Sequence, residues 1–463
     1  MLVPEAIVVG GAVLLLLSRF GGAQRTLRRN LPAFAVALLL IALVVELWAG
    51  ATLSSFFGGA LVQDRFALFA KAAALVAAGT AIAVTDWSAE DSLSIGLAMP
   101  LLAAFGVMVA ASAGDLVGLW AGLEVAAAAG VVLVSIRRPE LGLRLLVVGG
   151  VATALVLLGL AFVYATTGSA DLLSVQQIMY TAAPTLPLAI PVLLLLAGLA
   201  VRASLAPFQF AGVAGSLGAS PLGAGLVLGL VAAAGLIATI KIAAVLSPLP
   251  AVFSPYLEVL AAVAMVGGGA CALATRSPRA RLAYLGTGQV GWVAAGLATH
   301  YRAGLGASLF LVGAFAVAAT CGPAVMGGGE GGESSLAGMG ALRPARAAGI
   351  AMAFLSLAGA PPLAGFFGEF AVGAALAQSS HFELLALGLL GSVMSLAAAL
   401  GTLRVIYIQS PQEEGRRGHG LPAWTRFSTA GALALCLVIA GYGVFGSPIL
   451  GLAYQGAEAL GLR

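Results

Sequence analysis

Long apolar runs separated by short polar stretches repeat along the whole chain. About 20 apolar residues are enough to cross the hydrocarbon core of a bilayer as a helix. On that criterion the sequence predicts 14 membrane-spanning helices, and with them an all-α, polytopic membrane helix bundle. The predicted spans are 2–19, 31–50, 65–85, 92–112, 114–136, 141–166, 187–210, 222–247, 253–275, 281–299, 303–325, 346–378, 382–408 and 424–446. A short amphipathic helix on the membrane surface is expected at 171–183, and 327–335 has the composition of a flexible linker.

The composition agrees with this pattern. Of 463 residues, 61% are hydrophobic and only 9% are charged, whereas soluble domains carry about 25% charged residues. The chain is too poor in charge to cover a water-facing surface. The net charge of +4 does not indicate nucleic-acid binding, because almost all the basic residues are arginines and most of them lie in short loops.

The arginines predict the orientation of the chain. They gather in the loops near 25–29, 137–138, 276–281, 343–346 and 416–417. With an even number of spans, all these loops lie on one side of the membrane. Arginine-rich loops favour the cytoplasm, so we expect both termini on the non-cytoplasmic side.

Few charges lie at membrane depth. A charge at the centre of a bilayer costs at least about 2.5 kcal/mol, so such residues are normally paired or functional. The candidates are Glu124 in the fifth span, Arg202 in the seventh, Lys241 in the eighth and Glu369 in the twelfth. Glu46 and Lys71 lie nearer the ends of their spans, where a side chain can snorkel to the surface.

Prolines interrupt two of the spans beside these charges. Pro207 follows Arg202, and Pro361 and Pro362 precede Glu369. The two spans are five apart and therefore cross the membrane in opposite directions, as in transporters built from inverted repeats with broken helices. We expect a single membrane domain, 1–463, with inverted repeats at 92–247 and 253–408 and flanking helices at 1–91 and 424–463. The simpler alternatives are proline kinks and a Glu124–Arg202 pair that only packs two helices together.

Other polar residues carry weaker signals. Gln209, Gln289, Thr239 and Thr287 could extend a polar path, although each is individually better explained by a hydrogen bond between helices. The three cysteines lie in separate apolar runs without metal-ligand spacing, and they are expected to be buried thiols. The sequence has no dinucleotide fingerprint, cluster-ligating cysteine set or haem motif, so we predict no cofactor and no catalytic redox site in this chain.

Four segments resemble the antiporter-like subunits of respiratory complex I, and the N-type subunit most closely. They are LVGLWAGLEV, LAVRASLAPFQF, RARLAYLGTGQVGW and FLSLAGAPPLAGFFGEF. DRFALFAK and RRPELGLRLLVVGG resemble the entrances to that family's third and sixth spans. The resemblance runs from about residue 60 to 450, in the family's order.

The resemblance implies a proton-translocating subunit of an NADH:quinone oxidoreductase in the bacterial inner membrane. FMN, iron–sulfur clusters and quinone are then expected in partner subunits, and the neighbours are other antiporter-like and small membrane subunits. Two alternatives stay open. The subunit could be a structural element that has lost its own proton path. It could instead belong to a related assembly: a membrane-bound hydrogenase, an Mrp-type cation antiporter or an inorganic-carbon uptake system.

The resemblance also implies residue roles, with several departures. Glu124 matches the family's acid on span 5, but Arg202 stands where the family has a lysine. The span-8 lysine position is near Ala233 and is apolar. Three further positions lack the basic group that the family has there. Gln209 and Gln289 stand in place of histidines, and Glu369 stands in place of the N-type lysine.

These departures change the expected chemistry. Arginine stays protonated where a buried lysine can release its proton. We therefore expect Arg202 to anchor Glu124 electrostatically rather than to carry a proton. Lys241 could replace the missing lysine, but it lies about two turns further along the span, so a basic residue near the helix end is the favoured interpretation.

Overall fold

The computed structural model of the protein describes residues 2–19, 25–50, 54–87, 92–181, 186–327, 333–410 and 426–460. The first half of the chain forms α1 (Val3–Leu17), α2 (Arg25–Ala49), α3 (Arg65–Val84), α4 (Leu93–Ser112), α5 (Leu116–Ser135), α6 (Pro139–Thr167), α7 (Leu172–Thr181), α8 (Leu186–Arg202), α9 (Phe210–Gly218), α10 (Pro221–Leu226), the π-helical η3 (Val227–Val231) and α11 (Ala232–Val245). The second half forms α12 (Pro250–Ala274), α13 (Pro278–Ala298), α14 (Arg302–Met326), η4 (Glu333–Leu336), α15 (Met339–Leu342), α16 (Pro344–Leu357), α17 (Ala364–Gln378), α18 (Phe382–Tyr407), α20 (Arg426–Val444) and α21 (Gly446–Ala459).

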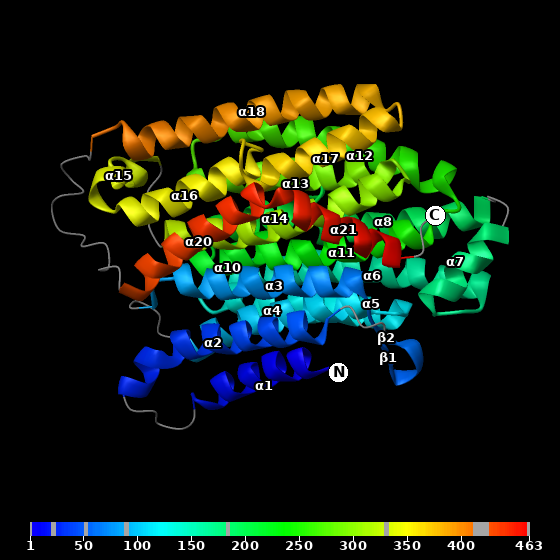
Figure 1. Cartoon of the computed structure of the whole chain (residues 1–463), viewed down its shortest axis with the longest axis horizontal. Coiled ribbons are helices and arrows are strands. Elements are labelled where there is room, and N and C mark those ends of the chain that lie inside the picture. Colours follow the sequence, from blue (N-terminus) through cyan, green and yellow to red (C-terminus); the bar gives the residue numbers. More distant parts are fainter. Residues whose placement is uncertain are drawn as a thin grey trace.

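The predicted helical membrane bundle is confirmed. Among the residues that the structure describes, ten helices are long and apolar enough to cross a membrane. The helices lie side by side along one axis, and both chain ends lie toward the same end of the bundle (Figure 1). The exact number of spans stays a prediction.

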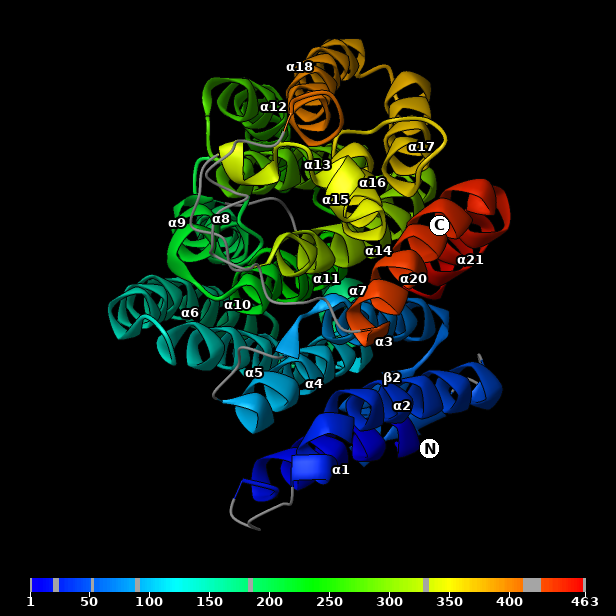
Figure 2. The same ribbon diagram turned by 90° about the vertical axis from the view of Figure 1, so that its left-hand side faces the viewer.

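Helix α14 and the α10–α11 segment form the centre of the bundle, as the view along its axis shows (Figure 2). The apolar window of α14 is fully buried and that of Pro221–Val245 is 94% buried, against 28% for α6. Gly225 and Gly229 face Thr320 so closely that neither position has room for a side chain. Small residues let these central helices approach at backbone distance, as is common in membrane bundles.

Non-helical residues separate α8 from α9 and α16 from α17. Helix α8 ends at Arg202 and α9 begins only at Phe210, while α16 ends at Leu357 and α17 begins at Ala364. Each loop holds a cis peptide bond before proline, at Pro207 and at Pro362. The symmetry relation between the two halves stays a prediction.

The structure differs from the predicted spans at two places. The seventh span continues beyond 210, because α9 extends the chain to Gly218. The last predicted span, 424–446, agrees with α20, but a further helix that the sequence did not predict, α21, follows it and continues to Ala459. The chain bends between them where Gly443 contacts the backbone at Pro362 and Leu363, in the second helix break.

The residues before α3 also depart from a purely helical chain. They form a two-stranded antiparallel hairpin, β1 (Ser54–Phe56) and β2 (Leu61–Gln63). A helix is present as α7 where the surface helix was expected, and its place on the membrane surface stays a prediction. Most of the expected linker at 327–335 lies outside the described residues.

The contact between α4 and α5 allows a direct test of this packing. A Cβ at Gly122 would lie 2.7 Å from the carbonyl oxygen of Gly106, on the facing helix. We expect Gly122→Val to force the helices apart, at a cost of about 1–3 kcal/mol or more, and to lower the yield of folded protein from membranes. Gly150→Val is the matched control, since nothing lies within 4 Å of a Cβ at Gly150. Equal yields of the two variants would contradict this packing.

Candidate functional site

The first polar cluster joins α5, α6 and α8. Arg202, the last residue of α8, forms an ion pair with Glu124 of α5, as the placement of the charges predicts. Thr153 of α6 donates a hydrogen bond to the same Glu124 oxygen at 2.7 Å and also accepts one from Arg202. The Arg202 side chain is only 8% exposed, so the guanidinium depends on these partners inside the bundle.

Glycines on two neighbouring helices make room for Arg202. A Cβ at Gly149 of α6 would lie 3.4 Å from the guanidinium. On the other side, Gly235 of α11 packs against the backbone of Arg202 and Ala203. The arginine is therefore held where α8 ends, between α6 and α11, at the start of the interruption.

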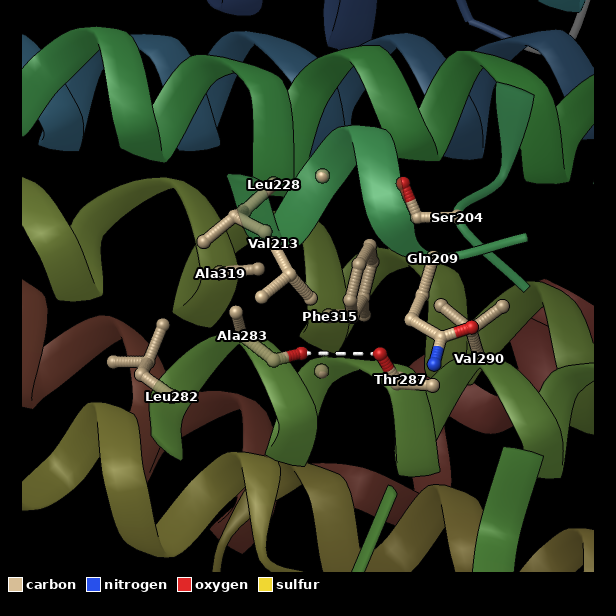
Figure 3. Close-up of a pocket in the computed structure, with 12 residues that line it drawn as sticks. Ser204, Gln209, Val213, Leu228, Leu282, Ala283, Thr287, Val290, Phe315 and Ala319 are labelled. Atoms are coloured by element: carbon tan, nitrogen blue, oxygen red, sulfur yellow. Dashed lines mark hydrogen bonds between the residues drawn. The ribbon is translucent and has the colours of Figure 1, made fainter. Parts of the chain in front are cut away.

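A cavity opens beside the arginine. Its wall includes Arg202, Gly149, Ser204 and Gly212, and the Nε atom of Arg202 is buried without a hydrogen-bond partner. Ser204 and Gly212 also line a second cavity, shown in Figure 3, which extends to α13. The two cavities are thus neighbours that share a wall at the interruption of α8 and α9.

Gln209 and Thr287 are polar groups of the second cavity. Gln209 comes from the residues between α8 and α9, and its Oε1 atom is buried without a partner. Thr287 lies on the α13 side, where its hydroxyl donates to the carbonyl of Ala283 at 3.2 Å (Figure 3). The cavity therefore offers Gln209 as an unsatisfied acceptor, the kind of group that buried water usually satisfies.

The second polar cluster surrounds Glu369 of α17. Gln289 of α13 donates to one carboxyl oxygen and Ser392 of α18 donates to the other, each at 2.5 Å. Trp292 donates in turn to Ser392 at 3.0 Å. In the part of the chain that the structure describes, no basic side chain forms an ion pair with Glu369, so neutral groups alone satisfy it.

The second helix break shapes this cluster. Gly359 lies at the end of α16 with φ +68°, a conformation that favours glycine. A Cβ at this position would lie 2.5 Å from the carboxyl oxygen Oε1 of Glu369. The glycine in LAGAPP therefore permits both the turn of the chain and the close approach of the buried carboxyl group.

The structure does not bring all the predicted residues together. Thr287 and Gln289 are two positions apart on α13 and so point to different sides of that helix. Gln209 therefore reaches the near side of α13, while Gln289 and Glu369 lie across it. Thr239 bonds to its own helix, at the carbonyl of Gly235, and joins neither cluster.

Lys241 lies apart from both clusters. Its ammonium donates to the carbonyl of Ala113 at 2.6 Å and lies 5.5 Å from the centre of the Phe66 ring. It is six residues, or about 9 Å, further along α11 than Gly235, where that helix meets Arg202. This placement agrees with a basic residue near the helix end and not with a replacement for the lysine missing near Ala233.

Sequence reasoning missed four residues of the site: Thr153, Gly359, Trp292 and Ser392. Hydroxyl side chains in the apolar sixth and thirteenth spans were available signals, but such a hydroxyl usually bonds to its own helix. Among the described residues, no group of three or more histidine, cysteine or acidic side chains is placed to hold a metal ion.

Comparison with known proteins identifies the architecture. Residues 113–395 match the family model of the NADH:quinone oxidoreductase/Mrp antiporter transmembrane region. NADH-quinone oxidoreductase subunit N 1 of Rhizobium meliloti (strain 1021) is 30% identical, over 97% of this chain and 94% of that protein. The chain belongs to this antiporter-like family, and within it to the subunit N type. It is a multi-pass membrane protein, as its apolar helices and its family both show.

Chains of solved respiratory complexes have the same fold as this antiporter-like chain. A chain of respiratory complex I from Thermus thermophilus with bound aureothin matches with a TM-score of 0.81 and 25% identity, over 97% of this chain and 99% of that one. A chain of the membrane-bound sulfane sulfur reductase, an archaeal respiratory membrane complex, has a TM-score of 0.84 at 19% identity, over 99% and 96%. The second likeness concerns the fold alone.

The pairing in the first cluster can be tested by a double-mutant cycle. Arg202→Gln leaves the Glu124 carboxylate without its cation, and we expect the folded protein to lose up to about 3 kcal/mol. The double variant Glu124→Gln/Arg202→Gln should recover most of the loss, since neither charge remains. Thermal unfolding of the detergent-extracted protein measures both. A double variant that is no more stable than Arg202→Gln alone would contradict the pairing.

Proposed function

We propose that this chain is the proton-translocating, antiporter-like subunit N of a complex I-type NADH:quinone oxidoreductase. The observation that carries the proposal is the placement of two carboxyl groups, Glu124 and Glu369, beside the two interruptions of the bundle. Ionisable groups are rare at membrane depth and mark ion pathways when they are retained there. The names of the relatives supply the class of assembly.

The residues of the two clusters have different roles in proton transfer because of their chemistry. Arg202 keeps its proton at any physiological pH, so it does not carry protons. It pairs with the Glu124 carboxylate, and any displacement of the guanidinium would leave that carboxylate without its cation. Glu124 and Glu369 are then the groups that bind and release protons, while Gln209 and Gln289 orient water and carboxyl groups without titrating.

The two cavities provide the connection on the Arg202 side of α13. They run from Arg202 past Ser204 to Gln209 and Thr287. Water in these cavities would give a proton a hydrogen-bonded route toward the Glu369 cluster, with α13 as the last barrier.

Partner subunits complete the first cluster. A third of the Glu124 side chain is not covered by this chain. A carboxylate in that position would not face lipid, so we infer that a neighbouring membrane subunit covers it. Redox chemistry in the partners, with FMN, iron–sulfur clusters and quinone, would act on Glu124 across this contact, and this chain contributes no redox site.

The membrane and the orientation follow from the same proposal. We place the chain in the bacterial inner membrane with both termini on the non-cytoplasmic side, because its arginine-rich loops gather at the opposite side. We also propose that 92–247 and 253–408 are inverted repeats, each containing one helix break and one buried carboxyl group.

Proton pumping by the purified, reconstituted complex tests the proposal. We expect Glu124→Gln to lower the number of protons moved per electron transferred, because the amide cannot bind the proton. Glu140→Gln, the same change at an exposed residue in the first turn of α6, is the matched control. An unchanged ratio in Glu124→Gln, in complexes that contain the subunit, would refute a role for Glu124 in proton transfer.

A further inference from the structure

A third charged network lies outside both clusters, where α1, α2 and α3 meet. Lys71 of α3 forms an ion pair with Glu5 of α1 and donates to Gln63 Oε1 at 2.5 Å. The amide nitrogen of Gln63 then donates to Glu46 of α2 at 2.6 Å. The four side chains thus form one continuous hydrogen-bonded row, Glu5–Lys71–Gln63–Glu46.

The network is buried, contrary to the expectation that Glu46 and Lys71 snorkel. Both residues are only 1% exposed, and Glu5 is 7% exposed. The residues lie near the start of α1, the end of α2 and the start of α3, which is the end of the bundle toward which both chain termini lie (Figure 1). Burial of unbalanced charge at such a site is costly.

The charges in the row do not balance. Two carboxylates share one ammonium, which leaves one negative charge when both acids are ionised. The second oxygen of Glu5, Oε2, is buried and has no hydrogen-bond partner. Among the described residues, Asp64 and Lys241 also lie close enough to influence these charges, and because their signs are opposite they leave the excess unchanged.

The orientation of Gln63 determines where a neutralising group can bind. Lys71 only donates hydrogen bonds, so the Gln63 oxygen must face it and the amide N–H₂ must face Glu46. The row therefore links the two acids through one cation and one neutral amide. A proton is the smallest group that removes the excess charge, and a carboxyl group at either end of the row can hold it.

We propose that Glu5, Lys71, Gln63 and Glu46 form an additional proton-binding site that holds one proton between its two carboxyl groups. The site is separate from the Glu124–Arg202 cluster. The part of α11 between Gly235 and Lys241 is buried and largely apolar, and its one hydroxyl, Thr239, bonds within the helix. The bound proton therefore exchanges with the membrane face at which α1 begins, not with the route past Arg202.

Other titratable groups near this end of the bundle must be distinguished from the row. Asp64 caps α3 by accepting from Ala67 at 2.7 Å, and burial raises its pKa above the ordinary value. Further out, Arg302 and Glu458 of α14 and α21 pair at 3.5 Å and are half exposed. Asp115 accepts from the backbone of Gly118 at the start of α5. Asp64 is the closest competitor and supplies the control.

Infrared spectroscopy of the assembled complex tests the site. A protonated carboxyl group gives a C=O stretching band that shifts in deuterium oxide, and we expect wild type to lose one such band as the pH rises. Glu46→Gln should lack that band, whereas Asp64→Asn, which keeps a capping side chain, should retain it. A band that persists in both Glu46→Gln and Glu5→Gln, or that disappears only in Asp64→Asn, would overturn the proposal.

A second variant keeps the test decisive if the acid-to-amide changes prevent assembly. Lys71→Gln removes the shared cation, so the two acids should hold a proton at an alkaline pH at which wild type has already lost it. A band that is unchanged in Lys71→Gln would refute a shared proton.

Proton pumping separates this site from the proposed function. Glu46→Gln should pump as many protons per electron as wild type, and Glu124→Gln should retain the band; a pumping loss in Glu46→Gln equal to that in Glu124→Gln would contradict the separation.

Discussion

The ion pair between Arg202 and Glu124 determines where three helices of the first half meet. Arg202 is nearly buried, and only Glu124 and Thr153 supply its side-chain partners on α5 and α6. An unpaired charge at this depth would cost more than most single packing contacts. The surrounding features follow from this constraint: α8 ends at the arginine, glycines of α6 and α11 make room for it, and a cavity opens beside it.

In the described part of the second half of the chain, the buried carboxyl group of Glu369 has no cation as its partner. Glu369 is satisfied by an amide and a hydroxyl instead of a cation, and Gly359 lets the broken helix approach it closely. A carboxyl group with neutral partners can change its protonation state without leaving a cation unpaired. The two halves thus have similar breaks but unequal electrostatics. In the proposed path, a fixed positive charge thus lies on one side of α13 and a carboxyl group without a cation lies on the other.

Much of the architecture could be predicted from the sequence because lipid imposes simple rules. Apolar runs of about 20 residues predicted the spans, and the scarcity of buried charge singled out Glu124, Arg202 and Glu369. Contacts between helices that are distant in the sequence could not be predicted. Glu46 and Lys71 are close to the ends of their spans, but they bond to residues of other helices that no local pattern reveals. The bend between α20 and α21 likewise depends on the backbone at Pro362, far away in the sequence.

The central claim is that protons pass between the Glu124 and Glu369 clusters through the two cavities at the α8–α9 interruption. A map of the assembled complex that resolves ordered water tests it most directly. We expect water in both cavities, with one molecule bonded to the Gln209 oxygen and a hydrogen-bonded chain from Arg202 to Thr287. Cavities that are empty of water, or closed by the packing of side chains in every functional state, would contradict it.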